Sequence, residues 1–160
     1  MDTVISAVAM ESVPQLVTSV AALFAEDGGQ RDRHMDTAWP KREGRNYYAT
    51  LLEDHRSLCL LAYSQAGARA AVAGHLIGRM IRANPLRPDA VVAVLESMRV
   101  NPAHRREGIG TLLMGHFRQW ALLLGANEAS VTAYAANTSA IEFYSHHGFV
   151  PFELTLHTPL

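Results

Sequence analysis

Two glycines and two arginines between a predicted strand and a predicted helix form a segment that can hold an anion. The segment reads Glu96-Ser-Met-Arg-Val-Asn-Pro-Ala-His-Arg-Arg-Glu-Gly-Ile-Gly-Thr111. At a helix start the first N–H groups have no partner within the helix, so a phosphate accepts several of them. Gly108 and Gly110 lack the Cβ atoms that keep a phosphate at a distance, and Arg105 and Arg106 add positive charge. The same glycines also suit an ordinary tight turn, and this pattern alone does not decide between the two.

Two common phosphate loops do not match this segment. The dinucleotide-binding fingerprint requires a third glycine where Leu113 stands, and the nucleotide P-loop ends in Gly-Lys-Ser/Thr, which this segment does not contain. The segment does match an Arg-x-x-Gly-x-Gly pattern, formed by Arg105, Gly108 and Gly110 and preceded by Val100-Asn-Pro102. In this pattern the sequence resembles the GNAT superfamily of N-acetyltransferases, in which the segment cradles the pyrophosphate of acetyl-coenzyme A.

A second segment strengthens the resemblance. Asn137-Thr-Ser-Ala-Ile-Glu-Phe-Tyr-Ser-His-His-Gly-Phe149 is similar to the family's other signature, in which an asparagine opens a helix, a tyrosine lies near its end and Gly-Phe begins the next strand. The clear matches cover residues 90–152. The resemblance implies the GNAT fold, an α/β fold with a mixed, mostly antiparallel twisted sheet flanked by helices. It also implies acetyl-coenzyme A as co-substrate and no metal.

The resemblance implies a role for each residue that matches a motif. Tyr144 would donate a proton or hydrogen bond to the leaving sulfur, unless its ring only packs with Phe143 and Phe149 in the core. The backbone N–H of Met98 would stabilise the charge that develops on the carbonyl oxygen, with Val100 pairing with the pantetheine arm. The other residues implied to bind the coenzyme are Arg99, Arg105, Arg106, Gly108, Ile109, Gly110, Thr111, Asn137 and Ala140.

Glu96 interrupts an otherwise apolar strand, and a buried carboxylate needs a reason. Two-residue alternation predicts that it shares a face with Met98 and Val100. Some small-amine acetyltransferases of the family carry a glutamate here that acts as general base, directly or through water, and the resemblance assigns this role to Glu96. A structural hydrogen-bonding role, or one that only orients the acceptor, stays open. Asn137 likewise has a plain alternative as the N-cap of its helix.

Acceptor recognition is expected from the first helix, the loop that follows it and the second helix, which form the variable side of the family's fold. Glu26 and Asp27 stand at the end of the first predicted helix. Adjacent carboxylates near a cleft attract a cationic amine. A solvated polar loop explains these two residues equally well.

The elements that must position these residues follow from hydrophobic periodicity and turn residues. We expect helices at residues 13–24, 46–53, 109–124 and 138–147. Residues 30–44 show no sustained period and are predicted to form a long loop. The strands at residues 57–64, 71–81 and 90–100 are expected to form an antiparallel meander, and the other strands are predicted at residues 4–10, 129–134 and 149–157.

Composition describes one ordinary globular domain spanning residues 1–160, because 49% of the residues are apolar and 18% are charged. The net charge is −1, and neither half has a basic surplus, so nucleic acid is not an expected partner. No apolar run is long enough for a bilayer crossing and no leader is evident, which predicts a cytoplasmic protein without membrane association.

Cys59 is the only cysteine, which excludes an internal disulfide. Lys41 is the only lysine, and this arginine excess fits a GC-rich bacterial genome.

The combined interpretation is an N-acetyltransferase in which a primary amine of a small molecule attacks the thioester directly in a ternary complex. Two alternatives stay open. One is a non-catalytic module that binds or senses acyl-coenzyme A, and the other is a peptide or protein acetyltransferase. The sequence does not identify the amine, exclude longer acyl groups or decide whether the chain forms a homodimer, which is common among similar proteins.

Overall fold

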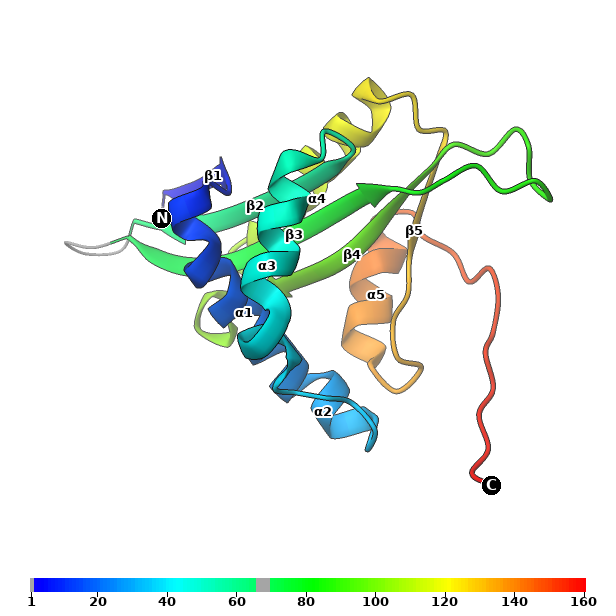
Figure 1. Cartoon of the computed structure of the whole chain (residues 1–160), viewed down its shortest axis with the longest axis horizontal. Helices are drawn as coiled ribbons and strands as arrows, with labels where there is room; N and C mark the ends of the chain where they lie inside the picture. Colours follow the sequence, from blue (N-terminus) through cyan, green and yellow to red (C-terminus); the bar gives the residue numbers. More distant parts are fainter. Residues whose placement is uncertain (1, 66–69) are drawn as a thin grey trace.

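A five-stranded sheet forms the centre of the computed structural model, which describes residues 2–65 and 70–160 (Figure 1). Its strands lie in chain order: β1 (Thr3–Ala7), β2 (Ser57–Ser64), β3 (Ala71–Met80), β4 (Val92–Val100) and β5 (Glu128–Val131). Neighbours from β1 to β4 are antiparallel, whereas β5 is parallel to β4. The predicted mixed, mostly antiparallel sheet and its central meander are therefore confirmed.

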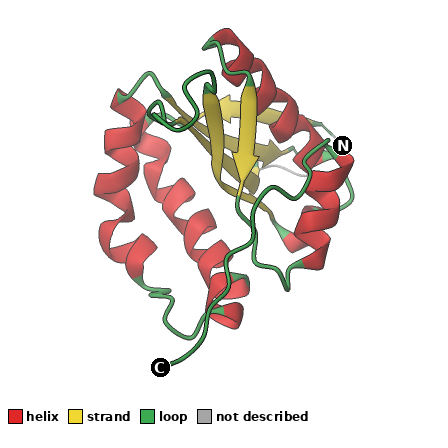
Figure 2. Cartoon of the chain, turned by 90° about the vertical axis from the view of Figure 1, so that its right-hand side faces the viewer, coloured by secondary structure: helices red, strands yellow, loops and turns green. Residues whose placement is uncertain are grey.

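Helices cover both faces of the sheet (Figure 2). On one face lie α1 (Val13–Glu26) and α3 (Trp39–Glu53), and on the other lie α4 (Ile109–Leu123) and α5 (Thr138–His146). The first face is filled by residues such as Leu16, Val20 and Ile77, and the second by Leu76, Leu113 and Phe117. No helix in the described ranges is both long and apolar enough to cross a membrane.

The prediction of one long loop at residues 30–44 is wrong in part. A short helix, α2 (Gly28–Arg31), follows α1 directly, and α3 begins at Trp39 instead of residue 46. Pro40 lies in the first turn of α3, where its missing N–H costs no hydrogen bond, so this proline starts a helix instead of marking a loop. The Trp39 ring also stacks on Phe24 of α1, with 6.2 Å between centroids, which fixes the start of α3.

A β-bulge in β4 changes which face Glu96 occupies. Ser97 pairs with Ile77 and Leu95 pairs with Gly78, so Glu96 is an extra residue with no partner on β3. Leu95 and Met98 both pack in the core beneath α4, whereas Glu96 contacts Tyr47 of α3 on the opposite face. The expectation that Glu96 shares a face with Met98 and Val100 is therefore wrong, because the extra residue interrupts the alternation.

Strands β4 and β5 pair only over a short distance. Residues 92–95 lie opposite residues 128–131, and β5 ends at Val131, earlier than the predicted residue 134. From Ser97 to Val100, β4 pairs only with β3 among the described strands. The two parallel strands thus leave a gap at their carboxyl ends, with the start of α4 beside it.

The final predicted strand, at residues 149–157, does not form. Residues 149–160, here called the tail, contain no helix or strand and run outside the sheet to the C-terminal end in Figure 1. An alternating pattern favours extended backbone, but a strand also requires a neighbouring edge with which to pair. Within the described part of this chain, no strand pairs with the tail.

Candidate active site

The gap beside β4 exposes backbone N–H groups of the strand. Asn101 donates its N–H to the carbonyl oxygen of Ala73 on β3 at 2.7 Å. Successive residues of a strand direct their N–H groups to opposite sides, so those of Met98 and Val100 point away from β3 and toward the gap. The N–H of Met98 is therefore positioned to donate to a ligand oxygen.

The glycine-containing loop leads from this strand into α4 through two residues in left-handed backbone conformation. Arg106 has φ 68° and Gly108 has φ 80°. The first helical hydrogen bond runs from the N–H of Leu112 to the oxygen of Gly108 at 3.1 Å. The N–H groups of Ile109, Gly110 and Thr111 precede this bond and have no acceptor within the helix, which makes them available to an anion.

Glycine is suited to these two positions of the loop, Gly108 and Gly110, for different structural reasons. A Cβ placed on Gly108 would meet no heavy atom within 4 Å, so open space lies above it and an anion can approach the backbone. A Cβ on Gly110 would lie 3.0 Å from Cε2 of Phe143 and 3.4 Å from Cε of Met98. Gly110 is therefore needed for the close packing of α4 against α5 and β4, and Gly108 is the glycine that fits a phosphate cradle.

The arginines near the loop are partly engaged with Glu26. Nε of Arg99 lies 2.5 Å from Oε1 of Glu26, and Nη2 of Arg105 lies 3.9 Å from Oε2. Nε of Arg105 also donates to the carbonyl oxygen of Val100 at 3.2 Å. Glu26 is thus balanced by positive charge and joins the end of α1 to the loop, a geometry that does not favour its predicted role in binding a cationic amine. Arg106 is exposed.

Asn137 connects the start of α5 to the end of α1. Its Oδ1 accepts the N–H of Ala140 at 3.2 Å, which confirms the N-cap interpretation, and its Nδ2 donates to Oδ1 of Asp27 at 3.1 Å. Asp27 also pairs with Arg31 at 2.9 Å. These contacts place Asp27 between the two helices that border the gap, while contact of Asn137 or Ala140 with a coenzyme stays a prediction.

Tyr144 of α5 combines a packed ring with an available hydroxyl group. Its ring makes edge contacts with Phe143 and Phe149, at centroid distances of 5.4 Å and 5.7 Å. Burial, with a smaller contribution from Asp27, raises the pKa of Tyr144 to about 12, so the phenol is protonated at neutral pH. No residue in the described part of the chain hydrogen-bonds to this hydroxyl. The core-packing interpretation and a donor role are therefore compatible.

Glu96 lies at the surface of the α1 and α3 face, where it belongs to a small polar cluster. Its side chain is 27% exposed, so the expectation of a buried carboxylate is wrong. Tyr47 donates its hydroxyl to Oε1 of Glu96 at 2.7 Å, and Nη1 of Arg79 lies 3.3 Å from the same oxygen. Burial and the nearby Glu96 raise the pKa of Tyr47 to about 12, which keeps it a donor. The edge of Trp39 completes the cluster, 5.3 Å from Tyr47 between centroids.

Sequence reasoning missed Arg79 and the contact of Tyr47 with Glu96. These partners lie 17 and 49 residues away from Glu96 along the chain, and only the bulge turns Glu96 toward them. Without the bulge, regular alternation along β4 would turn Glu96 to the opposite face, away from Tyr47 and Arg79. The only available signal was the presence of Tyr47 in the helix that was expected to contact the acceptor.

His75 supports the strand segment next to Glu96. The ring is fully buried, with Nδ1 2.6 Å from Oγ of Ser19 and Nε2 2.8 Å from Oγ of Ser97. Burial, and to a smaller extent the charge of Arg99, lowers the pKa of His75 to about 3, so the imidazole is neutral at physiological pH. His75 therefore joins α1, β3 and β4 as a structural residue.

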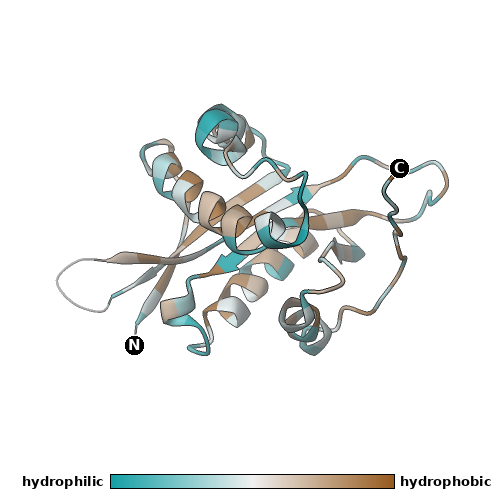
Figure 3. Cartoon of the chain, turned by 90° about the horizontal axis from the view of Figure 1, so that it is seen from below, coloured by the Kyte–Doolittle hydropathy of each residue, from teal (hydrophilic) through white to brown (hydrophobic). Residues whose placement is uncertain are grey.

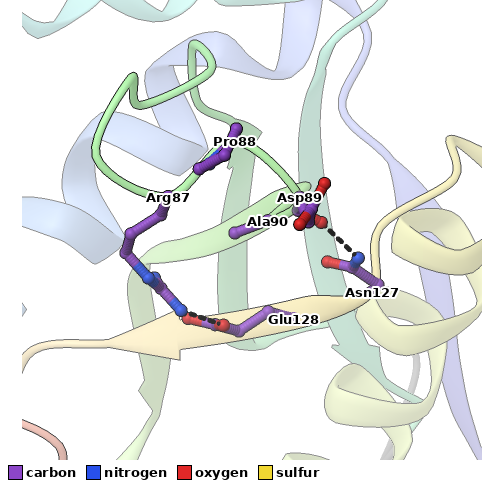
Figure 4. A pocket seen from close by; sticks show the side chains of 6 residues that line it. All are labelled: Arg87, Pro88, Asp89, Ala90, Asn127 and Glu128. Atoms are coloured by element: carbon purple, nitrogen blue, oxygen red, sulfur yellow. Dashed lines mark hydrogen bonds and ion pairs between the residues drawn. The ribbon is translucent and has the colours of Figure 1, made fainter.

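One surface cavity lies away from these groups. It has a volume of about 440 Å³ and is found at the amino ends of β4 and β5, opposite the gap (Figure 4). The Arg87–Glu128 ion pair at 2.5 Å and the Asn127 side chain, which donates to the oxygen of Asp89 at 2.8 Å, border it. In α/β sheets, ligands usually bind outside the carboxyl ends of parallel strands. The gap is therefore the favoured binding site. The described residues contain no cluster suited to a metal ion.

Comparison with known proteins agrees with the geometry. The sequence model of the Acetyltransferase (GNAT) family matches residues 22–149. A curated relative, Acetyl transferase GW6a of Oryza sativa subsp. japonica, is 34% identical over 67 residues. That match covers 41% of this chain but only 16% of the rice protein, so the chain corresponds to a small part of that relative.

Solved structures show the same fold at low sequence identity. A mutant of the BH1408 protein from Bacillus halodurans superimposes with a TM-score of 0.84 at 14% identity, covering 98% of this chain and 99% of the other. AAC(6')-Iy, solved in complex with the bisubstrate analogue CoA-S-monomethyl-acetylneamine, gives a TM-score of 0.75 at 16% identity, with coverage of 100% and 99%. The arrangement of sheet, loop and helices is thus shared over nearly the whole chain.

Proposed function

The chain belongs to the acetyltransferase (GNAT) family, and from that membership we propose that it transfers the acetyl group of acetyl-coenzyme A to a primary amine of a small molecule. The observation that carries this proposal is the gap between β4 and β5. Met98 from β4, Gly110 from α4 and Phe143 from α5 meet there, with Tyr144 next in the chain.

The residues beside the gap fit the coenzyme. The free N–H groups at the start of α4 and the open space above Gly108 suit its pyrophosphate, with Arg105 and Arg106 supplying positive charge. Val100 presents its backbone N–H to the gap, where the amide groups of the pantetheine arm can pair with it. When bound, the coenzyme supplies an acyl group already activated as a thioester.

Three groups of this chain then have separate tasks. The N–H of Met98 stabilises negative charge that develops on the acyl oxygen. The Tyr144 hydroxyl, protonated at neutral pH, donates to the sulfur as the carbon–sulfur bond breaks. Glu96 accepts the proton that the attacking amine must lose, through water, because Glu96 and Met98 lie on opposite faces of the sheet.

A small cationic acceptor suits the α1 and α3 face. Oε1 of Glu96 contacts Tyr47 and Arg79, whereas Oε2 has no partner among the described residues. This second oxygen and the neighbouring rings of Tyr47 and Trp39 can attract an ammonium group by charge and by cation–π contact. The structural neighbour AAC(6')-Iy was solved with an analogue that joins coenzyme A to acetylneamine. Aminoglycosides and polyamines are therefore the first acceptors to test.

The test is thiol release from acetyl-coenzyme A with a panel of aminoglycosides, polyamines, amino acids and short peptides. We expect turnover with at least one small amine, and a loss of about 10²-fold or more in Glu96→Gln because general base catalysis is removed. Glu53→Gln, an exposed glutamate at the end of α3, is the matched control and should retain full turnover.

Two outcomes would contradict the proposal. If calorimetry shows coenzyme binding but no amine releases thiol, the chain is a binding or sensing module. If only peptides react, the acceptor class is wrong. Equal rates in Glu96→Gln and the wild-type protein would remove the base role while leaving the transferase activity in place.

A further inference from the structure

The polar residues of α1 form one stripe along an otherwise apolar helix (Figure 3). Thr18 and Ser19 follow Gln15 by three and four residues, and Glu26 follows Ser19 by seven. Residues at these spacings share one side of a helix. Polar side chains gathered in this way indicate either plain contact with water or a polar site between the helix and the sheet.

The stripe lines a surface cavity between α1 and the sheet. The cavity has a volume of about 320 Å³. On the sheet side it is bordered by Val72 near the start of β3, by Arg99 near the end of β4 and by Asn101 just after that strand. Small-molecule sites in proteins have volumes of about 300–1,000 Å³, so the space is large enough for a small ligand.

Three side chains that line this cavity have hydrogen-bond donors without partners. Oδ1 of Asn101 accepts the N–H of Ala103 at 3.1 Å, and Oε1 of Gln15 accepts the Tyr63 hydroxyl at 2.6 Å. The Nδ2 and Nε2 groups of these two amides have no partner among the described residues. The same holds for both terminal nitrogens of Arg99, in which only Nε is hydrogen-bonded.

The charge around the cavity is positive. Arg99 is among its lining residues, and no aspartate or glutamate is among the described residues that line it. Arg99 and Arg105 share one carboxylate, Glu26, whose oxygens lie 2.5 Å and 3.9 Å from their nitrogens, so one positive charge of this group is not balanced. The Arg99 side chain is only 12% exposed, and water therefore screens its charge weakly.

We propose that this cavity is a second ligand site, which binds a small anion of the phosphate or carboxylate class. The oxygens of such an anion match the free donors of Arg99, Gln15 and Asn101, and the two terminal nitrogens of the guanidinium can meet two oxygens at once. The cavity lies beside α1, whereas the proposed coenzyme site lies between β4, β5 and the start of α4. The anion is therefore a ligand other than the coenzyme, and the proposal does not depend on the proposed function.

Calorimetry with inorganic phosphate, and with citrate as a carboxylate probe, tests the site. We expect at least one of them to bind with a Kd of about 1 mM or tighter. Gln15→Glu and Asn101→Asp each keep the oxygen that accepts the present hydrogen bond and replace the free NH₂ group by a second oxygen. Each should weaken binding about 10-fold or more, because a donor is lost and a negative charge is added. Gln119→Glu, the same change at an exposed position of α4, is the matched control and should bind like the wild-type protein.

The same titration at saturating acetyl-coenzyme A separates the cavity from the glycine-containing loop. The coenzyme then fills the loop, and the heat of anion binding reports the cavity alone. We expect an unchanged Kd for the wild-type protein and the same loss in Gln15→Glu. If the chain bound no coenzyme, the proposed function would fail, while the first titration would still decide on the cavity.

Three results would overturn the proposal. The first is that neither phosphate nor citrate binds to the wild-type protein. The second is equal binding by Gln15→Glu, Asn101→Asp and Gln119→Glu, which would place the anion elsewhere. The third is that the wild-type protein loses anion binding when the coenzyme is present, which would show that the anion occupies the coenzyme site.

Discussion

Tyr144 combines a ring that packs in the core with a hydroxyl group that is available for the proposed chemistry. Two aromatic neighbours fix its ring, while its hydroxyl has no partner among the described residues. Burial disfavours the phenolate, which explains the raised pKa of Tyr144. The residue is thus held in one orientation with its proton in place, and the orientation costs nothing further when substrate arrives.

Replacement of Tyr144 by phenylalanine separates these two functions. Tyr144→Phe keeps the ring contacts but removes the donor, so we expect kcat to fall about 10²-fold while the dissociation constant of the coenzyme stays within about two-fold. Because the pKa of Tyr144 is raised to about 12, the phenol stays protonated up to pH 10, and wild-type turnover should show no loss from this group between pH 8 and pH 10. Stopped-flow or steady-state thiol release and calorimetry provide both measurements. Unchanged kcat in the variant would exclude the donor role.

The elements of the fold differ in how closely the sequence specified their bounds and contacts. Strand β2 and helices α4 and α5 have strong periodicity and clear end signals, such as Gly125 and Gly148 with positive φ after the helices, and were predicted within one residue at each end. The bulge at Glu96 has no comparable signal, because it depends on how β3 and β4 pair, and so the face of Glu96 was predicted wrongly. Elements whose signals are local in the sequence were predicted well. The side-chain partners of Glu96 and Glu26 were not predicted, because they come from distant elements.

The loop before α4 can be tested with two glycines that differ only in location. Gly108 has φ 80° and Gly125 has φ 81°, and a Cβ on either meets no atom within 4 Å. Alanine at each position therefore costs a similar free energy of unfolding, about 1 kcal/mol from left-handed backbone. We expect Gly108→Ala to weaken coenzyme binding at least 10-fold in calorimetry and Gly125→Ala to leave it unchanged. Equal binding by both variants would contradict the cradle at Gly108.

At the scale of the whole molecule, one buried histidine couples stability to pH. His75 lies between α1 and β4, and its pKa falls to about 3 in the folded chain, compared with about 6.5 when unfolded. Between these values the unfolded chain binds more protons, so the free energy of unfolding decreases as pH falls below 6.5. The contribution is fully present above pH 6.5 and is lost at up to about 1.4 kcal/mol per pH unit below it.

Urea unfolding at pH 7.5 and pH 5.0 measures this coupling. From His75 alone, the wild-type protein should lose up to about 2 kcal/mol of unfolding free energy between the two conditions. His75→Gln is expected to be less stable at both pH values but to show a smaller difference between them. His116→Gln, which alters an exposed histidine of α4, should retain the wild-type difference. The same pH difference in all three proteins would show that His75 does not titrate on unfolding.

The extra residue of the bulge in β4, Glu96, also affects which parts of this molecule can change during evolution. Because Glu96 faces α1 and α3 while Met98 faces α4 and α5, the proposed function requires the two reactants to approach from opposite sides of one sheet. Substitutions in α3 can therefore remodel the proposed acceptor side without disturbing the groups around Gly108, whereas the end of α1 is tied to the loop through Glu26. Under the proposed function, a lineage built on this plan can acquire new amines through changes in α3 while it inherits the same source of acyl groups.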